Sequence, residues 1–502
     1  MVVCERLELP AFGRAVYFSA DDRGKASPWP DDANRELPWI VTSEFAELFD
    51  GRVRNRAVGP PRREGMAILL ERTDGRVTAL LATPGESSLG LFVVQADGAL
   101  TVRAATLGTA ARSGAAPLFA YATAGTPAAA FRAAWRAAIE HGAVTSSTGW
   151  RWEKTYCDPF EYLGWCSWEH YKKEIDAESM AAAVRELTEG DVPVRWVLID
   201  DGHQLEHGLR LRSFDPDPAK FPDGWGPIVS LRNPRSIRWI GLWHCFQGLW
   251  KTLDEENDFG DLNDDLARLP TGGYLPRGDE AAASRFYDRL IGSAADAGFD
   301  FVKIDVQAGN LGWYRGTANA VEASSTNAHA LEAAVHERLA HGMINCMAHN
   351  ILCIFNTRHS AVSRCSIDYH LNDADSIASH IVQSYTNSLW MGWSVWPDHD
   401  MFHSSDVAAG RMMAVSKALS GAPVYLSDAP SQIRADLVRP LCLSDGRLLR
   451  PLAPAAPVPE STFLDALGEA DRPYLVVAPL TNRCAAVAAY TAVRAEHLPG
   501  RA

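Results

Sequence analysis

Charged residues recur where short apolar segments end, between residues 196 and 368. They are Asp200, Asp201, Lys303, Asp305, Arg364 and Asp368. Carboxylates and basic groups in this combination can fix sugar hydroxyls by charge-assisted hydrogen bonds. Two of the carboxylates can also serve as nucleophile and acid/base in a retaining displacement at a glycosidic carbon. The charges therefore predict a carbohydrate-processing site, provided that the fold brings them together.

Aromatic residues occur at comparable segment ends. WCSW contains Trp165 and Trp168, and LWHC contains Trp243 and His244. Indole faces pack on the apolar C–H face of a pyranose. We expect all four residues to contact substrate.

Each of these positions also has a purely structural interpretation. An Asp at a strand end is commonly a turn or capping residue, and Asp201-Gly202 alone is a frequent turn signal. His244 could be a satisfied core histidine, and Trp168 and Trp243 could be ordinary core aromatics. The repetition of such residues at corresponding segment ends favours a site.

The elements that must position these residues are short apolar strands alternating with amphipathic helices. The expected strands are Leu163–Ser167, Trp196–Asp200, Trp239–His244, Phe301–Asp305, Met343–Met347, Val362–Ser366, Leu389–Val395 and Val424–Ser427. The expected helices include Ala177–Glu189, Ala281–Ala295, Ala328–Leu339 and Asp406–Leu419. Eight strands with intervening helices predict an α/β fold of the (β/α)8 TIM-barrel type, whose active site lies at the carboxyl ends of the strands.

The segments on either side of the expected barrel have different residue patterns. Residues 1–122 contain short runs broken by Gly, Pro and Asp, which predicts an N-terminal β-sandwich. Residues 123–150 are expected to form a helical linker, and Thr126-Pro127 mark the start of its helix. The barrel then spans residues 151–430, and residues 431–502 form a small C-terminal β domain.

Bulk properties narrow the class of protein. The 502 residues carry a formal net charge of -14, which argues against a nucleic-acid partner. The start MVVCERLELP lacks a signal-peptide pattern, and no stretch predicts a membrane span. Nine cysteines without C-x-x-C pairs indicate reduced thiols. We therefore expect a soluble, cytoplasmic protein without a membrane partner.

Cofactor and metal motifs are not evident. Cys346 and His349 have a C-x-x-H spacing, but no second pair lies nearby to complete a zinc site. His399, Asp400 and His403 form a cluster that we interpret as shaping a loop. No GxGxxG, P-loop or GxSxG motif is present, so we expect neither a cofactor nor a metal.

Several motifs resemble those of a known family. LGWCSWEHY, VLIDDGHQ, FVKIDVQ, SRCSIDY, WPDHDMFHS and YLSDAP, followed by CLSDGRLLRP, resemble the raffinose synthase and α-galactosidase group allied to glycoside hydrolase family 36. The resemblance implies a barrel flanked by β domains and metal-free retaining chemistry on α-galactosides. It implies Asp305 as the nucleophile and Asp368 as the acid/base.

The same resemblance implies how the sugar is held. Lys303 and Arg364 would contact it, and Asp200 and Asp201 would bind the galactose hydroxyls. Two positions depart from the usual pattern: His203 replaces a tryptophan, and Ile367 replaces a common aspartate.

We expect hydrolysis of terminal α-galactosides through a covalent glycosyl-aspartate. Open alternatives are a galactosyltransferase of the raffinose-synthase kind, a retaining α-glycosidase for a related sugar, and a catalytically silent sugar-binding module. The expected partner is an oligosaccharide or small α-galactoside. The oligomeric state is open, and a homo-oligomer is compatible with the sequence.

Overall fold

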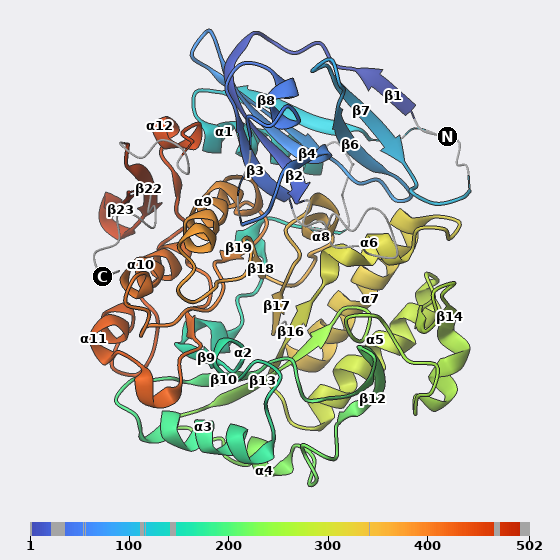
Figure 1. Cartoon of the computed structure of the whole chain (residues 1–502), viewed down its shortest axis with the longest axis vertical. Helices are drawn as coiled ribbons and strands as arrows, with labels where there is room; N and C mark the ends of the chain where they lie inside the picture. Colours follow the sequence, from blue (N-terminus) through green and yellow to red (C-terminus); the bar gives the residue numbers. More distant parts are fainter. Residues whose placement is uncertain are drawn as a thin grey trace.

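The chain is built around two eight-stranded sheets, one antiparallel and one parallel (Figure 1). This computed structural model describes residues 3–21, 36–53, 55, 57–110, 115, 117–140, 147–340, 342–465 and 472–491. Figure 1 shows the antiparallel sheet in blue above the parallel one.

The N-terminal strands form an antiparallel sheet. They are β1 Val3–Arg6, β2 Phe12–Asp21, β3 Glu36–Val41, β4 Pro61–Arg72, β5 Val77–Ala82, β6 Leu89–Val94, β7 Leu100–Ala105 and β8 Phe119–Ala124. The long strand β4 pairs with β2 along its whole length, with β6 near its start and with β5 further along, so these strands are hydrogen-bonded in one sheet. The antiparallel β structure expected for this segment is present.

Helix α1, Pro127–Glu140, begins at the predicted residue pair and packs on β5 and β8. Its buried Trp135 donates a hydrogen bond from Nε1 to the backbone oxygen of Trp390, 2.6 Å away in the barrel region. The segment predicted as a linker therefore connects the N-terminal sheet to a helix of the C-terminal half through a buried contact. The sequence predicts that this helix ends at Gly142, a residue outside the described ranges.

All eight strands of the second sheet run parallel. In chain order they are β9 Gly164–Cys166, β10 Trp196–Ile199, β13 Trp239–Cys245, β16 Phe301–Asp305, β17 Met343–Asn345, β18 Val362–Arg364, β19 Trp396–Asp398 and β20 Tyr425–Leu426. The spatial order is β19-β18-β17-β16-β13-β10-β9-β20. Phe402, just after β19, forms a parallel bridge with Leu426 of β20, so the sheet curls until its edges meet. This arrangement is barrel-like.

One predicted strand is wrong. Leu389–Val395 was expected as the seventh strand, but its first residues complete helix α9, Ala374–Met391, and the strand is Trp396–Asp398. Most side chains of α9 are buried, and a helix buried all round has no polar face to reveal its period. The apolar run therefore resembled a buried strand.

Large aromatic side chains fill the interior of the curled sheet. The rings of Trp196 and Phe301 lie 5.2 Å apart, edge to face. A Cβ atom on Gly164 would lie 2.1 Å from the Trp196 ring, and one on Gly241 would lie 2.2 Å from the Phe301 ring. Glycine is therefore required at both positions, because any larger residue would displace an interior ring.

Helices follow most of the strands. They are α2 Trp168–Tyr171, α3 Ala177–Glu189, α4 Gly226–Val229, α5 Glu280–Asp296, α6 Asn310–Trp313, α7 Ala320–Leu339, α8 Ile351–Phe355, α9, α10 Gly410–Ser420, α11 Ala435–Val438 and α12 Pro459–Thr462. Asp176, Asp279, Asn319 and Asp373 accept a backbone N–H at the starts of α3, α5, α7 and α9. Such caps fix where each helix leaves its preceding loop.

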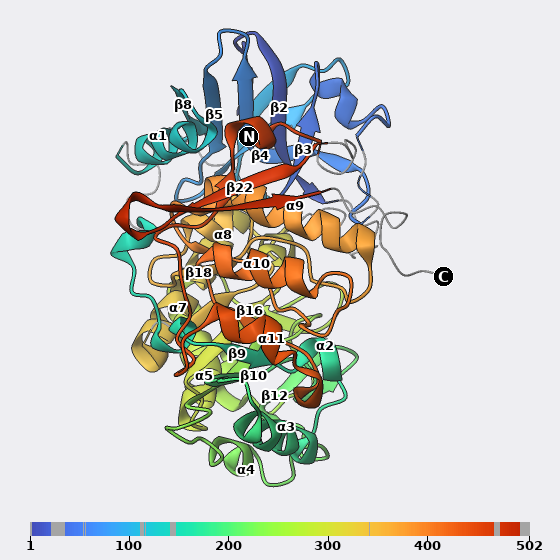
Figure 2. The ribbon, with the colours of Figure 1, turned by 90° about the vertical axis from the view of Figure 1, so that its left-hand side faces the viewer.

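Smaller sheets lie outside the parallel sheet. They are β11 Gln204–His207 with β12 Arg210–Pro216, β14 Leu266–Arg268 with β15 Tyr274–Pro276, and β21 Ala456–Pro457 with β22 Tyr474–Pro479 and β23 Ala485–Tyr490. The C-terminal strands lie beside α9 (Figure 2), where Tyr385 and Tyr490 hydroxyls are 2.6 Å apart. Within the described ranges, no helix has the length and apolar character needed to cross a membrane.

Candidate active site

Two oppositely charged side chains meet at the carboxyl ends of β10 and β16. Lys303 Nζ lies 2.9 Å from Asp200 Oδ2, which also accepts from Cys166 Sγ at 3.2 Å. Burial alone would lower the pKa of Lys303, but the Asp200 carboxylate and other nearby acidic groups raise it well above its usual range. The lysine therefore remains a fixed positive charge within this group.

Asp305 ends β16 on the same face as Lys303. Trp243 Nε1 donates to its Oδ2 at 3.2 Å, and the Val306 N–H donates to its Oδ1 at 2.7 Å. Val306 has a φ of 60°, a left-handed conformation that is strained for a β-branched residue. This turn aims the N–H at the carboxylate. Burial raises the pKa of Asp305, while Lys303 opposes the rise.

Asp201 is held beside Asp200 by a tight turn. Its Oδ2 accepts from Trp250 Nε1 at 2.7 Å and lies 3.2 Å from Lys173 Nζ. Its Oδ1 is buried and has no hydrogen-bond partner within the described ranges. Gly202 follows with a φ of 125°, and a Cβ there would clash with the Lys173 backbone. Asp201 can therefore be a turn residue and a site residue at the same time.

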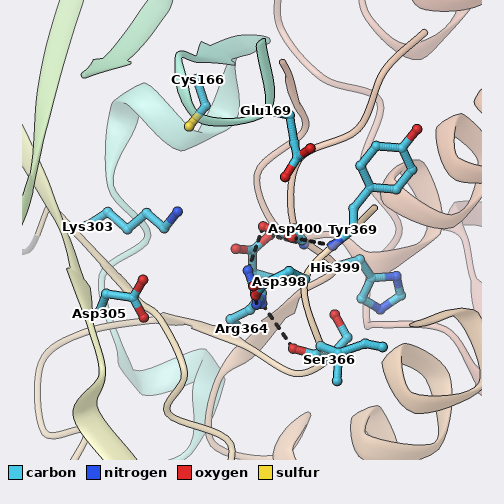
Figure 3. Close-up of polar contacts among 12 residues, drawn as sticks. Cys166, Glu169, Lys303, Asp305, Arg364, Ser366, Tyr369, Asp398, His399 and Asp400 are labelled. Carbon is cyan, nitrogen blue, oxygen red and sulfur yellow. Dashed lines mark hydrogen bonds and ion pairs between the residues drawn. The ribbon is translucent and has the colours of Figure 1, made fainter. Parts of the chain in front are cut away.

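Arg364 ends β18 and is an ionic centre facing Asp305 and Lys303. It pairs with Asp368 and with Asp400, the latter through Nη1 and Oδ1 at 2.7 Å. Figure 3 shows Lys303 and Asp305 pointing from one side toward the space that Arg364 and Asp400 face from the other. Asp368 is one of the charges that raise the pKa of Asp305, so the two carboxylates are within electrostatic reach.

Exposure distinguishes the two partners in the Arg364–Asp368 pair. The Arg364 side chain is 2% exposed, whereas that of Asp368 is 38% exposed. A carboxylate that reaches solvent can exchange protons with it, which an acid/base residue must do. Behind them Asp398 accepts from the Tyr425 hydroxyl at 2.8 Å. Burial raises the pKa of Asp398 to about 6, and Asp400 adds to the rise.

Helix α9 fixes the backbone just before Asp368. The Ile367 N–H donates to Gln383 Oε1 at 3.0 Å, and the Ile367 oxygen lies 2.9 Å from His380 Nδ1. Lys417 Nζ and the His399 backbone oxygen each lie 2.8 Å from His380 Nε2, so both ring nitrogens have polar partners. Burial lowers the pKa of Lys417 to about 8.

Two predicted site residues lie on the wrong face. Trp165 is in register with Val197, and His244 with Ile304, on the helix-facing side of the sheet. Side chains alternate along a strand, so a residue next to a site residue points away from it. Trp165 instead donates to the Asp428 backbone oxygen at 2.8 Å, and burial lowers the pKa of His244 to about 3. We correct both assignments.

Of the other two predicted aromatic residues, Trp243 joins the charged group through its hydrogen bond to Asp305. Trp168 lies half-buried at the start of α2, where Lys172 lies over its ring. Sequence reasoning missed Cys166, Glu169, Lys173, Trp250 and Asp398, and it assigned Asp400 only to loop shaping. Glu169 directly follows the quoted WCSW motif, which is the one signal that could have identified it.

The two departures from the family pattern have structural roles. His203 packs edge to face on Trp225 and lies 3.0 Å from the Trp243 oxygen through Nε2. Burial lowers the pKa of His203 to about 4, so the ring is neutral. The Ile367 side chain is buried in the core shared with the N-terminal sheet. Among the described residues, no group of three or more His, Cys, Asp or Glu could hold a metal ion.

Solved structures similar to this chain include α-galactosidases. TtGalA from Thermus thermophilus, solved with stachyose, has a TM-score of 0.57 at 16% identity, covering 89% of this chain and 93% of its own. AgaA from Geobacillus stearothermophilus, of glycoside hydrolase family 36, has a TM-score of 0.59 at 12% identity, covering 99% and 69%. At these identities the likeness establishes the fold.

Sequence comparison gives the family. The model described as "Raffinose synthase or seed imbibition protein Sip1" matches residues 118–210 and 275–477, more than half of the chain. The chain therefore belongs to this family, as its motifs predicted.

Curated relatives carry transferase names. A probable galactinol–sucrose galactosyltransferase 6 of Arabidopsis thaliana is 29% identical over 354 residues, covering 63% of this chain and 47% of the relative. Stachyose synthase of Pisum sativum is 28% identical over 310 residues, covering 56% and 36%. The chain spans about half the length, or less, of these two relatives.

Proposed function

We propose that this chain cleaves terminal α-galactosides with retention of configuration, using Asp305 as nucleophile and Asp368 as acid/base. The observation that carries the proposal is the pairing of a buried, doubly hydrogen-bonded Asp305 with a solvent-reaching Asp368 inside its electrostatic range. A nucleophile needs fixed orientation, whereas an acid/base needs proton exchange. The contrast between the two carboxylates matches those needs.

The reaction would proceed in two displacements. Asp305 attacks the anomeric carbon while Asp368 gives its proton to the departing glycosidic oxygen, which leaves a β-galactosyl ester on Asp305. Asp368, now ionised, takes a proton from the incoming hydroxyl as that oxygen attacks the ester carbon. Asp305 leaves as a carboxylate, and the product has the α configuration.

The glycone would be held by the group around β10. Asp201 Oδ1, buried without a hydrogen-bond partner in the described ranges, is suited to accept from a sugar hydroxyl. The second oxygen of this carboxylate is already fixed by Trp250. Lys303 would donate to a hydroxyl and, together with Arg364, favour the ionised form of Asp305.

Water is the proposed acceptor, and a second sugar is the rival acceptor. The relatives' names, galactinol–sucrose galactosyltransferase and stachyose synthase, favour transfer. Both reactions share the first displacement and differ only in what attacks the ester. One chemistry therefore accounts for both candidates.

A panel of p-nitrophenyl α-glycosides tests the proposal. The α-galactoside should be turned over, and proton NMR of early product should show the α-anomer first. Early β-anomer would overturn retention, and preference for another glycone would overturn the substrate. No turnover of any glycoside would favour a sugar-binding module.

The acceptor is tested in the same assay. With sucrose added, p-nitrophenol release that exceeds free galactose measures transfer. Equal amounts of the two products at high sucrose would identify a hydrolase.

A further inference from the structure

We propose that Trp168, Glu169 and Lys172 form the subsite for the second sugar, on the leaving-group and acceptor side of the reaction. This inference rests on the proposed function and extends it to residues with no assigned role there. The Glu169 carboxylate would accept hydrogen bonds from hydroxyls of that sugar, and the Trp168 indole would cover one of its apolar faces. No residue of this subsite takes part in the bond-breaking step.

Glu169 is fixed in place although it lies in a short loop helix. Its N–H donates to Ser427 Oγ at 2.8 Å, and that hydroxyl donates to the Cys166 backbone oxygen at 2.8 Å. The chain at Glu169 is thereby tied to the carboxyl end of β9 and to the segment after β20. Its side chain is only 6% exposed. The carboxylate is therefore presented in a defined direction.

That direction is toward the candidate site. In Figure 3 Glu169 points into the space above Arg364 and Asp400, across from Lys303 and Asp305. Burial raises the pKa of Glu169, Lys172 opposes the rise, and Asp400 and His370 also act on it. Besides Lys172 of its own loop, the charges near Glu169 are therefore Asp400, the partner of Arg364, and His370.

Position relative to Asp368 decides which sugar Glu169 would meet. The acid/base must lie next to the glycosidic oxygen, so the second sugar extends from the site on the Asp368 side. Asp368 and Asp400 both pair with Arg364, and Figure 3 shows Glu169 pointing toward Arg364 and Asp400. The glycone lies on the other side, between Asp305 and the Asp200–Lys303 pair. Glu169 therefore faces the second sugar.

The chemistry of the three residues suits a polyhydroxyl ligand. Lys172 Nζ lies 2.7 Å from Glu169 Oε1 and 5.2 Å from the centre of the Trp168 ring. Within the described residues, the second oxygen of Glu169 has no hydrogen-bond partner. A half-buried indole beside an oriented carboxylate and an ammonium group offers one apolar face and both donor and acceptor capacity.

The test compares two galactosides that differ beyond the scissile oxygen. Raffinose presents a sugar to the subsite, whereas p-nitrophenyl α-galactoside presents an aryl ring. Glu169→Gln and Glu169→Ala should lower kcat/KM for raffinose at least about 10-fold more than for the aryl substrate, because a hydrogen bond to a charged group is lost. Glu174→Gln, at an exposed glutamate of the same loop, is the control and should change neither value.

Equal losses on both substrates would overturn the inference and assign Glu169 a structural role. If the wild-type protein turned over no α-galactoside, the proposed function would fail, and the subsite would be tested by calorimetry. Glu169→Ala should then weaken binding of raffinose more than binding of galactose. Equal weakening of the two would overturn the subsite independently of catalysis.

Discussion

Lys303 Nζ and Asp200 Oδ2 lie 2.9 Å apart, and each side chain is only 3% exposed. The lysine comes from the same strand as Asp305, and the aspartate follows a strand two positions away in the sheet. A buried ion pair of this kind contributes little net stability, but the loss of one member leaves an uncompensated charge. Breaking the pair should therefore both destabilise the fold and disturb the arrangement of the site.

Lys303→Met should leave Asp200 buried and unpaired. We expect the free energy of unfolding to fall by about 3–5 kcal/mol, measured by urea denaturation. Adding Asp200→Asn should restore part of the stability, because the buried charge is gone, without restoring turnover. A double variant no more stable than Lys303→Met alone would show that the two charges are not coupled.

The two proposed catalytic carboxylates should respond differently to removal. Asp305→Gly should abolish turnover, and azide should restore it by yielding a β-galactosyl azide. Asp368→Gly should still release an activated aryl group, stall at deglycosylation, and be rescued by azide to an α-galactosyl azide. Chromatography and NMR distinguish the two azides. The reverse pattern would mean that the roles are exchanged.

The hydrogen bond from Trp243 to Asp305 should influence the pH profile. The nucleophile acts when ionised, so kcat/KM falls as the pH drops through the pKa of Asp305. Burial raises that pKa. The midpoint of the acid limb of the kcat/KM profile should therefore lie above about 3.9, the pKa of a free aspartate. Trp243→Phe removes a donor that favours the ionised form, and we expect the limb to move up by about one pH unit.

A matched control for this prediction is Trp165→Phe. Trp165 is equally buried in the same barrel but donates to a backbone oxygen on the helix-facing side. Its replacement should leave the acid limb unmoved. If both variants shifted the limb alike, the shift would reflect general loosening of the barrel.

Contacts of α9 with Ile367 should affect the acid/base step. His380→Leu removes the Nδ1 donor to the Ile367 oxygen, whereas His380→Asn keeps a donor near that place. We expect the leucine variant to lose activity on raffinose more than on an activated aryl galactoside, since a poor leaving group depends most on the acid. The asparagine variant should recover much of the loss. Equal losses on both substrates would indicate a structural effect only.

Strand-end chemistry was predictable because buried parallel strands show as continuous apolar runs, and a charge at the end of such a run stands out. This signal identified Asp200, Lys303 and Asp305. It does not reveal which side of the sheet each side chain faces. Trp165 and His244 were therefore placed in the site, although each is one residue away from a position that points into the barrel.

The loops carried weaker signals. Trp250 and Lys173 follow strands at no characteristic spacing, and they contact Asp201 only because the chain folds back over it. Asp398 and Asp400 were visible in the sequence, but the ion pair of Asp400 with Arg364 was not, because it joins the end of β18 to the segment after β19. Tertiary contacts of this kind leave no periodic trace in a sequence.

Helix α9 touches each part of the molecule that flanks the site. The oxygen of Trp390 accepts from Trp135 of α1, Tyr385 meets Tyr490 of the C-terminal sheet, and His380 holds the segment that carries Asp368. The two flanking regions therefore contact the same helix that holds the segment with Asp368, the proposed acid/base. Removing either region should loosen α9, so we expect a barrel prepared without them to lose much of the proposed activity.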